Sequence, residues 1–197
     1  MSAPEPGRAE LGAVLDACPR LAEGDAFPFA CMGCGDCCRA RKDLLLSGLD
    51  LYRLARRLAL PPHLVAAAFC RAGTGPSTGL PTLRLRPNPQ TGNCPFFDAG
   101  CTVHEARPLA CTLYPLGQSI DPDTLTVEYY SQTPLCGAQV PDRTLRDYLM
   151  DADLPARTGA DLCWAKICTR LSRMLLAAGG PAHPRWGMAQ HRAAKAL

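Results

Sequence analysis

The chain has 197 residues, of which 47% are hydrophobic, and this size suits one domain of ordinary dimensions. Its 21 lysines and arginines nearly balance 18 aspartates and glutamates, so the net charge of +3 does not predict binding to nucleic acid or to an acidic membrane surface. We find neither a signal-peptide pattern nor the roughly 18 uninterrupted apolar residues of a membrane span, and we therefore expect a cytoplasmic protein.

The N-terminal part of the chain is predicted to be a loose tail, residues 1–28, with one short helix near 9–17. Beyond the cysteine-rich run that follows it, leucines recur at helical spacing over about 48–59. Ser47 and Asp50 stand at the start of that helix in the pattern of a capping box, in which each side chain bonds the other residue's backbone amide.

A second helix and two strands are expected in the middle of the chain. Two consecutive prolines can open a helix over 61–70, because proline is tolerated in a first helical turn, and this helix would form a hairpin with the first one. The alternation in LPTLRLR predicts a strand over 80–86, and DTLTVEYY predicts another over 123–130.

The C-terminal part is predicted to be helical, with a short helix over 143–150 and a longer one over 161–178. The longer helix has an apolar stripe that is expected to face the core: Trp164, Ile167, Cys168, Leu171, Met174, Leu175 and Ala178. We therefore divide the chain into the N-terminal tail 1–28, a cysteine-cluster domain 29–140, helices that pack on it in 141–180, and a tail 181–197.

Cysteine is the unusual residue, since the chain has twelve. Cytoplasmic thiols are kept reduced, so a dense cysteine pattern there indicates metal binding or catalysis rather than a disulfide framework. In the run CMGCGDCC, Cys31 and Cys34 have the two-residue spacing of a metal knuckle, and Gly33 and Gly35 permit the tight turn that such a knuckle needs.

Cys37 and Cys38 complete this run as adjacent residues. Neighbouring side chains point to opposite faces of an extended chain and about 100° apart in a helix, so the pair is not expected to bind a single ion together. Three alternatives follow. The pair serves two centres, it touches different atoms of a polynuclear cluster, or one of the two cysteines is only structural.

Four further cysteines extend the pattern: Cys94, Cys101, Cys111 and Cys136. Cys94 is followed by Pro95, as in the Cys-Pro that closes a ferredoxin ligand run, although far more residues separate it from the preceding cysteines here. Eight thiols suffice for two sites, or for one iron–sulfur cluster and one zinc ion.

The combined motifs resemble the YkgJ-type cysteine-cluster family, whose members are described as candidate zinc- or iron-chelating proteins. The motifs are CMGCGDCC, CPF at Cys94, and a third one, CTVHEARPLACTLYP, that holds Cys101, Arg107, Pro108, Cys111, Tyr114 and Pro115. His104 stands where the family often has tyrosine, and Thr112 where an arginine commonly follows the cysteine. A relative of this family, the flagellin lysine methylase, is thought to pair an iron–sulfur cluster with S-adenosylmethionine, and only the cysteines carry the resemblance to it.

Other residues near the predicted ligands are weighed separately. His104 follows Cys101 at a spacing that zinc ligands tolerate, with a hydrogen-bonding neighbour as the alternative role. Arg107 and Tyr114 are candidates for contacts to the bound group, and Arg107 has a structural role in the turn as its alternative. The remaining cysteines are expected to be ordinary core or surface thiols: Cys18, Cys70, Cys163 and Cys168. No motif names catalytic residues.

The sequence predicts an α+β fold: a single small domain, mostly helical and irregular, with a short β-hairpin or small sheet, wrapped around a cysteine-ligated metal centre. The predicted ligands are Cys31, Cys34, Cys37, Cys38, Cys94, Cys101, Cys111 and Cys136. We favour an iron–sulfur cluster, [4Fe–4S] in form, over zinc, because the adjacent cysteines and the Cys-Pro suit a polynuclear cluster.

Three functions are compatible with that centre. The first is an iron–sulfur protein with a redox or modification-linked role and a redox partner. The second is a zinc-binding domain, either a structural one that meets a protein partner through the C-terminal helix or a metal-handling one. A cluster-dependent, methyltransferase-like activity is the third. The sequence leaves open whether the protein is an enzyme.

Overall fold

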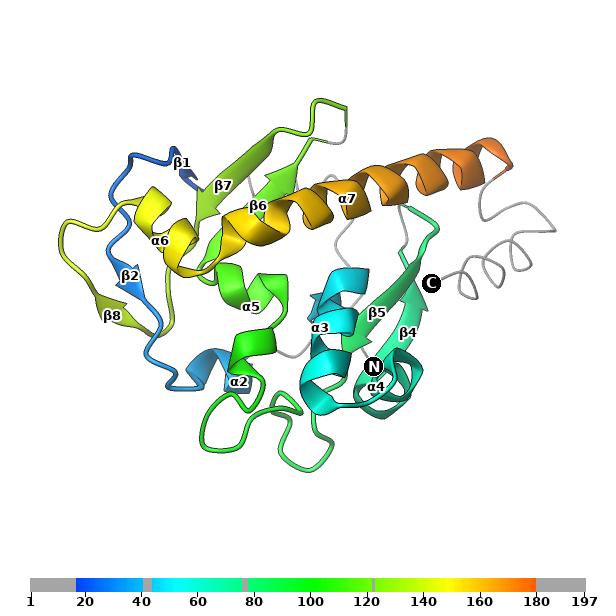
Figure 1. The fold of residues 1–197 in the computed structure, drawn as a ribbon, viewed down its shortest axis with the longest axis horizontal. Helices are drawn as coiled ribbons and strands as arrows, with labels where there is room; N and C mark the ends of the chain where they lie inside the picture. The colour runs from blue at the N-terminus through cyan, green and yellow to red at the C-terminus, as the bar shows by residue number, and fades with distance from the viewer. Residues whose placement is uncertain (1–16, 41–43, 76–77, 122, 180–197) are drawn as a thin grey trace.

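The computed structural model describes residues 17–40, 44–75, 78–121 and 123–179 (Figure 1). The helices within these residues are α2 (Asp36–Ala40), α3 (Gly48–Leu58), α4 (Pro62–Phe69), the short 3₁₀ helix η1 (His104–Ala106), α5 (Leu109–Leu113), α6 (Leu145–Asp151) and α7 (Leu154–Ala177). The predicted tail 181–197 and, apart from residue 17, the helix predicted near 9–17 lie outside the described residues.

The strands of the described residues form three small antiparallel sheets. The first has the order β1 (Arg20–Leu21), β7 (Val127–Ser131), β6 (Leu116–Ile120), the second pairs β2 (Phe29–Ala30) with β8 (Ala138–Gln139), and the third has the order β3 (Leu45–Leu46), β5 (Pro81–Leu85), β4 (Cys70–Thr74). The predicted α+β class is confirmed, with more sheet structure than one hairpin.

The first predicted helix is confirmed as α3, together with its capping box. The Ser47 hydroxyl accepts a hydrogen bond from the Asp50 amide at 3.1 Å, and the Asp50 carboxylate accepts one from the Ser47 amide at 2.9 Å. The second helix is confirmed as α4, which follows Pro61 and packs against α3. It ends at Phe69, because Cys70 already belongs to β4.

The predicted strand 80–86 is confirmed as β5, and the strand predicted over 123–130 is confirmed in part, because β7 begins only at Val127. Their hairpin partners β4 and β6 are not indicated by the sequence pattern. Each contains a glycine, Gly73 in β4 and Gly117 in β6, in place of a regular alternation of apolar and polar side chains.

Two clusters of buried side chains form the core. One includes Leu54 of α3 and Val65 of α4, both 0% exposed, with side chains from β3, β4 and β5. The other includes Leu145 and Tyr148 of α6, with side chains from β2, α5 and β6. In Figure 1, α3, α4, β4 and β5 lie on one side of α5, and α6, β2 and β8 lie on the other. The two clusters therefore flank the middle of the molecule.

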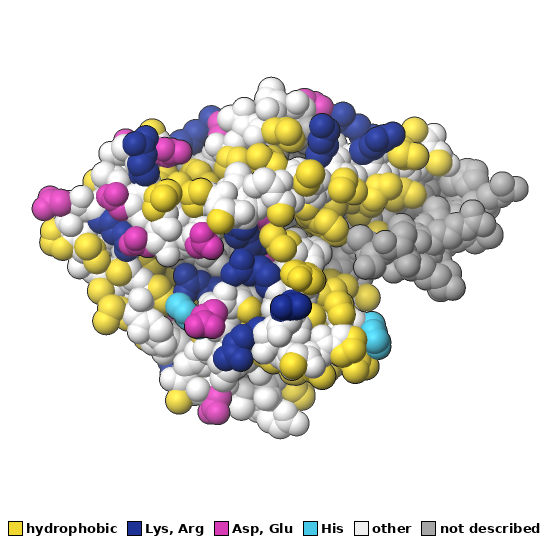
Figure 2. Space-filling view, viewed as in Figure 1, with side chains coloured by type: hydrophobic (Ala, Val, Ile, Leu, Met, Phe, Trp, Pro, Cys, Tyr) yellow, Lys and Arg dark blue, Asp and Glu magenta, His cyan; other side chains and the backbone are white. Residues whose placement is uncertain are grey.

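The long C-terminal helix starts earlier than predicted, and only part of its apolar stripe faces the rest of the protein: Trp164 packs against Gly48 at the start of α3, whereas other members are exposed. The predicted helix 161–178 is α7, which begins at Leu154. Ile167, Leu171 and Met174 of the stripe are 51%, 38% and 59% exposed, so the prediction that they are buried is wrong. Figure 2 shows hydrophobic side chains on the surface over this helix.

The outer half of α7 lies over two loops rather than over a core, which explains the exposure. The Ser172 hydroxyl donates to the Thr78 carbonyl at 2.9 Å in the β4–β5 loop, and Arg173 pairs with Asp123 at 2.8 Å in the β6–β7 loop. The pattern of apolar residues identified a helix, but it could not identify what lies against each face.

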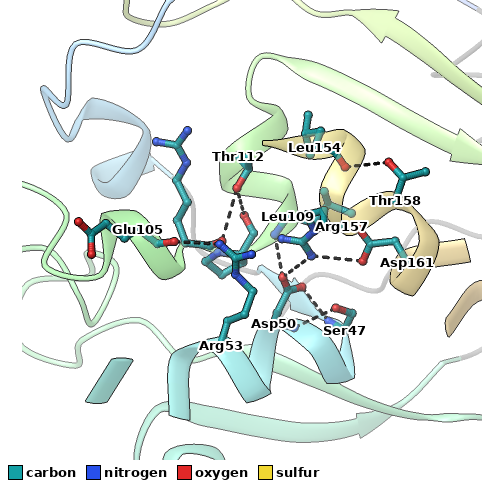
Figure 3. A network of polar contacts seen from close by, with 12 residues as sticks. Ser47, Asp50, Arg53, Glu105, Leu109, Thr112, Leu154, Arg157, Thr158 and Asp161 are labelled. Carbon is teal, nitrogen blue, oxygen red and sulfur yellow. Dashed lines mark hydrogen bonds and ion pairs between the residues drawn. The ribbon is translucent and has the colours of Figure 1, made fainter. Parts of the chain in front are cut away.

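The inner half of α7 is attached to α3 and α5 by a buried ionic network (Figure 3). Arg157 donates to Asp161 at 2.7 Å and to Asp50 of α3 at 2.9 Å, and these three residues are 5%, 7% and 2% exposed. The Asp50 carboxylate also accepts the amide of Leu109, the first residue of α5, at 2.8 Å. Buried charges of this kind are stable only when paired, so the network fixes how the three helices meet.

We predict that Arg157→Ala lowers the free energy of unfolding by about 3–5 kcal/mol, because it leaves two buried carboxylates without a counter-charge. Urea unfolding followed by circular dichroism measures this loss. The matched control is Arg173→Ala in the same helix, whose ion pair is exposed and whose removal is expected to cost less than about 1 kcal/mol. Equal losses for both variants would contradict the role given to the network.

Candidate metal centre

The first cysteine run folds as a tight turn followed by a short helix. Gly33 and Gly35 have φ of +66° and +77°, values that glycine adopts without the strain of a side chain. A Cβ at Gly35 would lie 2.1 Å from the Phe97 ring, so this position also needs the absence of a side chain. The Gly35 carbonyl accepts the amide of Cys38 at 2.9 Å, which starts α2.

The second pair of cysteines is placed by backbone hydrogen bonds. The amide of Cys94 donates to the carbonyl of Cys38 at 2.9 Å, which joins the two cysteine segments directly. The chain then turns back, with the amide of Thr102 bonded to the carbonyl of Phe96 at 3.0 Å. Cys101 is thereby returned to the side of Cys94.

The segment between Cys101 and Cys111 is held by side chains of α3. Arg53 donates to the carbonyl of Glu105 at 2.9 Å, and Arg57 donates to the carbonyl of Thr102 at 3.4 Å. The contact of Asp50 with the start of α5 fixes the helix that carries Cys111. A helix that lies outside the cysteine motifs therefore positions two of the predicted ligands.

The last predicted ligand reaches the site through the pairing of β2 with β8. Ala30 pairs with Ala138, so Cys31, directly after β2, and Cys136, two residues before β8, are brought to the same end of the paired strands. Gly137, with φ of +121°, allows this approach, because a Cβ there would lie 2.2 Å from the Phe29 ring.

All eight cysteines that the sequence predicts as ligands line one cavity. The empty space along this wall is about 750 Å³, a volume that includes solvent at the open mouth. The rest of the wall is largely apolar and aromatic, and it draws on both core clusters: Phe29, Tyr114 and Tyr148 on one side, and Leu85, Phe96 and Val103 on the other. Cys18, Cys70, Cys163 and Cys168 are not part of this wall.

Cys38 contacts three other thiols, and these contacts have electrostatic consequences. Cys38 forms hydrogen bonds with Cys101, Cys37 and Cys94, and these contacts raise the pKa of the Cys38 thiol far above its ordinary value. The same contact lowers the pKa of Cys101 to about 6 and also lowers the pKa of Cys94. Thiolates this close repel one another, so the group holds its charge only with a shared proton or a cation. A bound metal ion would replace that proton, and the donor set fits such a group.

A second group of ligand atoms includes a carboxylate that the sequence analysis did not identify. One ligand atom each from Cys34, Asp36 and Cys136 lies within 4.8 Å of the other two. Burial raises the pKa of Cys136 to about 11, and its hydrogen bond with Cys34 acts in the same direction. The position of Asp36 inside the cysteine run was the only sequence signal for it.

The other predicted site residues lie at the wall of the cavity. Arg107 and His104 both line it and contact each other through a guanidinium nitrogen and Nε2. The Tyr114 hydroxyl accepts the amide of Leu135 and so ties the wall to the loop that carries Cys136. Contacts of Arg107 and Tyr114 with a bound group, and ligation by His104, remain predictions.

The fold and the convergent thiols define the class of protein, a small α+β domain built around a cysteine-lined cavity. A family model described as "CxxCxxCC: Putative zinc- or iron-chelating domain" matches residues 30–137, and the chain belongs to this family. The predicted membership in a cysteine-cluster family is thereby confirmed, and metal binding is the function that family and site support together. No curated protein and no solved structure matches the chain.

The length and composition of the helices bear on whether the chain could cross a membrane. Within the described residues, no helix combines the length and the apolar character that crossing a membrane requires.

We predict that Gly35→Ala causes the purified protein to lose most of its bound metal, because the added Cβ displaces Phe97 and distorts the turn before α2. Elemental analysis of metal per chain measures the loss. Gly33→Ala is the matched control, since it has a similar φ but nothing within 4 Å of its Cβ. It shares the backbone cost of about 1 kcal/mol without the clash. Full metal content in Gly35→Ala, or an equal loss in both variants, would show that the contact with Phe97 does not matter.

Proposed function

We propose that the cavity binds an iron–sulfur cluster, [4Fe–4S] in form, and that the protein has a redox or modification-linked role. One observation carries the proposal: the adjacent Cys37 and Cys38 both line the cavity, and their thiols are in contact with each other. A contact between the two thiols disfavours two separate centres with one cysteine each. The two cysteines can instead bind different irons of a polynuclear cluster, which is one of the three alternatives that the sequence leaves open.

The number and surroundings of the thiols give further support. Eight cysteines line the cavity, whereas a single tetrahedral ion takes four ligands. Apolar side chains such as Phe96 and Val103 limit the access of water, which is one way in which proteins set the reduction potential of a cluster. When bound, such a cluster would supply one-electron transfer.

Arg107 is the residue of this chain that we expect to balance the charge of the thiolates. Its positive charge lowers the pKa of Cys101, in addition to the larger effect of the hydrogen bond from Cys38. A cation at this wall would stabilise the thiolate form of the ligands whether or not metal is present, and would offset part of the negative charge of a bound cluster.

Zinc is the second candidate, and the Cys34, Asp36 and Cys136 group favours it, because its ligand atoms have the close spacing of a single ion's ligands. In that case the protein would be a structural or metal-handling domain, with its partner at the exposed apolar residues of α7. Methyl transfer is a weaker candidate, since the sequence has no glycine-rich motif for its cosubstrate.

The proposal predicts that protein purified without oxygen and without an affinity metal contains iron and acid-labile sulfide in equal amounts. A broad sulfur-to-iron charge-transfer absorption should accompany them and should bleach reversibly on reduction. Cys94→Ser is expected to lose most of the iron, because Cys94 lies in the contacting thiol group.

Cys163→Ser is the matched control for this experiment. Cys163 is exposed on α7 and does not line the cavity, so its replacement should leave iron and sulfide unchanged. Zinc without sulfide or colour in the unmodified protein would exclude the iron–sulfur proposal and would favour the zinc candidate.

A further inference from the structure

We propose that Cys34, Asp36 and Cys136 form a separate site for one divalent cation of the zinc type, beside the iron–sulfur site. The inference deepens the proposed function and rests on it only in assigning the contacting thiols around Cys38 to the cluster. It adds a carboxylate ligand to the cysteines and divides the cavity wall between two centres of unlike chemistry.

The spacing of the three ligand atoms is that of a single ion's coordination sphere. Zinc–sulfur bonds of about 2.3 Å at tetrahedral angles separate two ligand sulfurs by about 4 Å. The three atoms of this group all lie within 4.8 Å of one another. Small side-chain movements therefore suffice to place all three on one cation.

The thiol contacts divide these cysteines into two groups. The Cys136 thiol is hydrogen-bonded to the Cys34 thiol and to the backbone amide of Cys37, whereas the Cys38 thiol is hydrogen-bonded to the thiols of Cys101, Cys37 and Cys94. The first group joins the glycine-rich turn and the first residue of α2 to the loop before β8, and the second joins the later residues of α2 to the segment that follows β5. The two groups thus meet at α2, but they join it to different parts of the chain.

The donor types also differ between the two groups. Thiolates alone are the common ligands of iron–sulfur clusters, whereas zinc accepts thiolate sulfur and carboxylate oxygen together. Cys34 and Asp36 are exposed, so a fourth position on the cation would face solvent and hold water. Two thiolates and one carboxylate carry three negative charges that repel one another. Binding of a divalent cation would offset most of this charge.

Two neighbouring features hold the ligands in place. Arg39 donates to the Asp36 carboxylate and lies over the Phe97 ring at 4.7 Å, so it restricts the orientation of the carboxylate. Both partners of this ion pair are 52% exposed, and an exposed pair is too weak to exclude a cation. In the loop before β8, Gly137 and the pairing of β2 with β8 fix the position of Cys136.

Equilibrium dialysis of the anaerobically purified protein against Co²⁺ alone, with elemental analysis of cobalt and iron, tests the inference. The unmodified protein is expected to bind one Co²⁺ per chain in addition to its iron. Asp36→Asn should weaken Co²⁺ binding at least about tenfold and should leave iron and sulfide unchanged. Even the loss of a residue that only supports a ligand typically weakens metal binding by about this factor, so the loss of a ligand should weaken it at least as much. Asp98→Asn, an exposed aspartate in the loop after Cys94, is the matched control and should bind Co²⁺ as the unmodified protein does.

The outcomes separate this inference from the proposed function. Unchanged Co²⁺ binding in Asp36→Asn, or loss of iron together with cobalt, would overturn the separate site. Retention of Co²⁺ binding in Cys94→Ser, with its iron gone, would support two centres. A protein that never contains iron but binds Co²⁺ through Asp36 would overturn the iron–sulfur proposal and leave the cation site standing.

Discussion

The Asp50 carboxylate is the contact on which the arrangement of the cavity depends. It is 2% exposed and accepts hydrogen bonds from the Ser47 amide, the Leu109 amide and the Arg157 guanidinium. One side chain thereby joins the start of α3, the start of α5 and the inner half of α7. Because an unpaired buried carboxylate is costly, the three helices are expected to adopt this arrangement together rather than one at a time. The helix that carries Cys111 is thus fixed by residues that have no part in the cysteine motifs.

The cysteine spacing predicted which thiols line one cavity, but it could not predict which of them contact one another there. All eight expected cysteines line the cavity, since their spacing reflects a shared site rather than a local structure. Asp36 was missed because a single aspartate has many uses, and only its distance from Cys34 and Cys136 distinguishes it. The contact between the thiols of Cys37 and Cys38 could not be predicted either. The periodicity of the backbone gives the direction of each side chain, but not the conformation that it adopts in a crowded cavity.

Sequence patterns predicted the elements whose structure depends on residues close in sequence. They failed to predict burial, which depends on contacts with distant elements. The capping box at Ser47 fixed the start of α3, because it is a contact between residues close in sequence. The stripe on α7 predicts a core face, yet Ile167 and Met174 are exposed, because the sequence of a helix does not show which other elements cover it. The same helix is anchored by the polar Arg157 and Asp161, which a pattern of apolar residues cannot identify.

The cavity wall is built from elements too short to be stable alone, and this links metal binding to folding. α2 and α5 have five residues each, and β2 and β8 have two each, whereas isolated helices are marginal below about 12–15 residues and a lone hairpin is marginal at best. The two apolar clusters stabilise the elements on either side, but the contacting thiols repel one another as they lose protons. Ligand bonds to a cation would reverse the sign of that interaction, so part of the binding free energy is folding free energy of the wall.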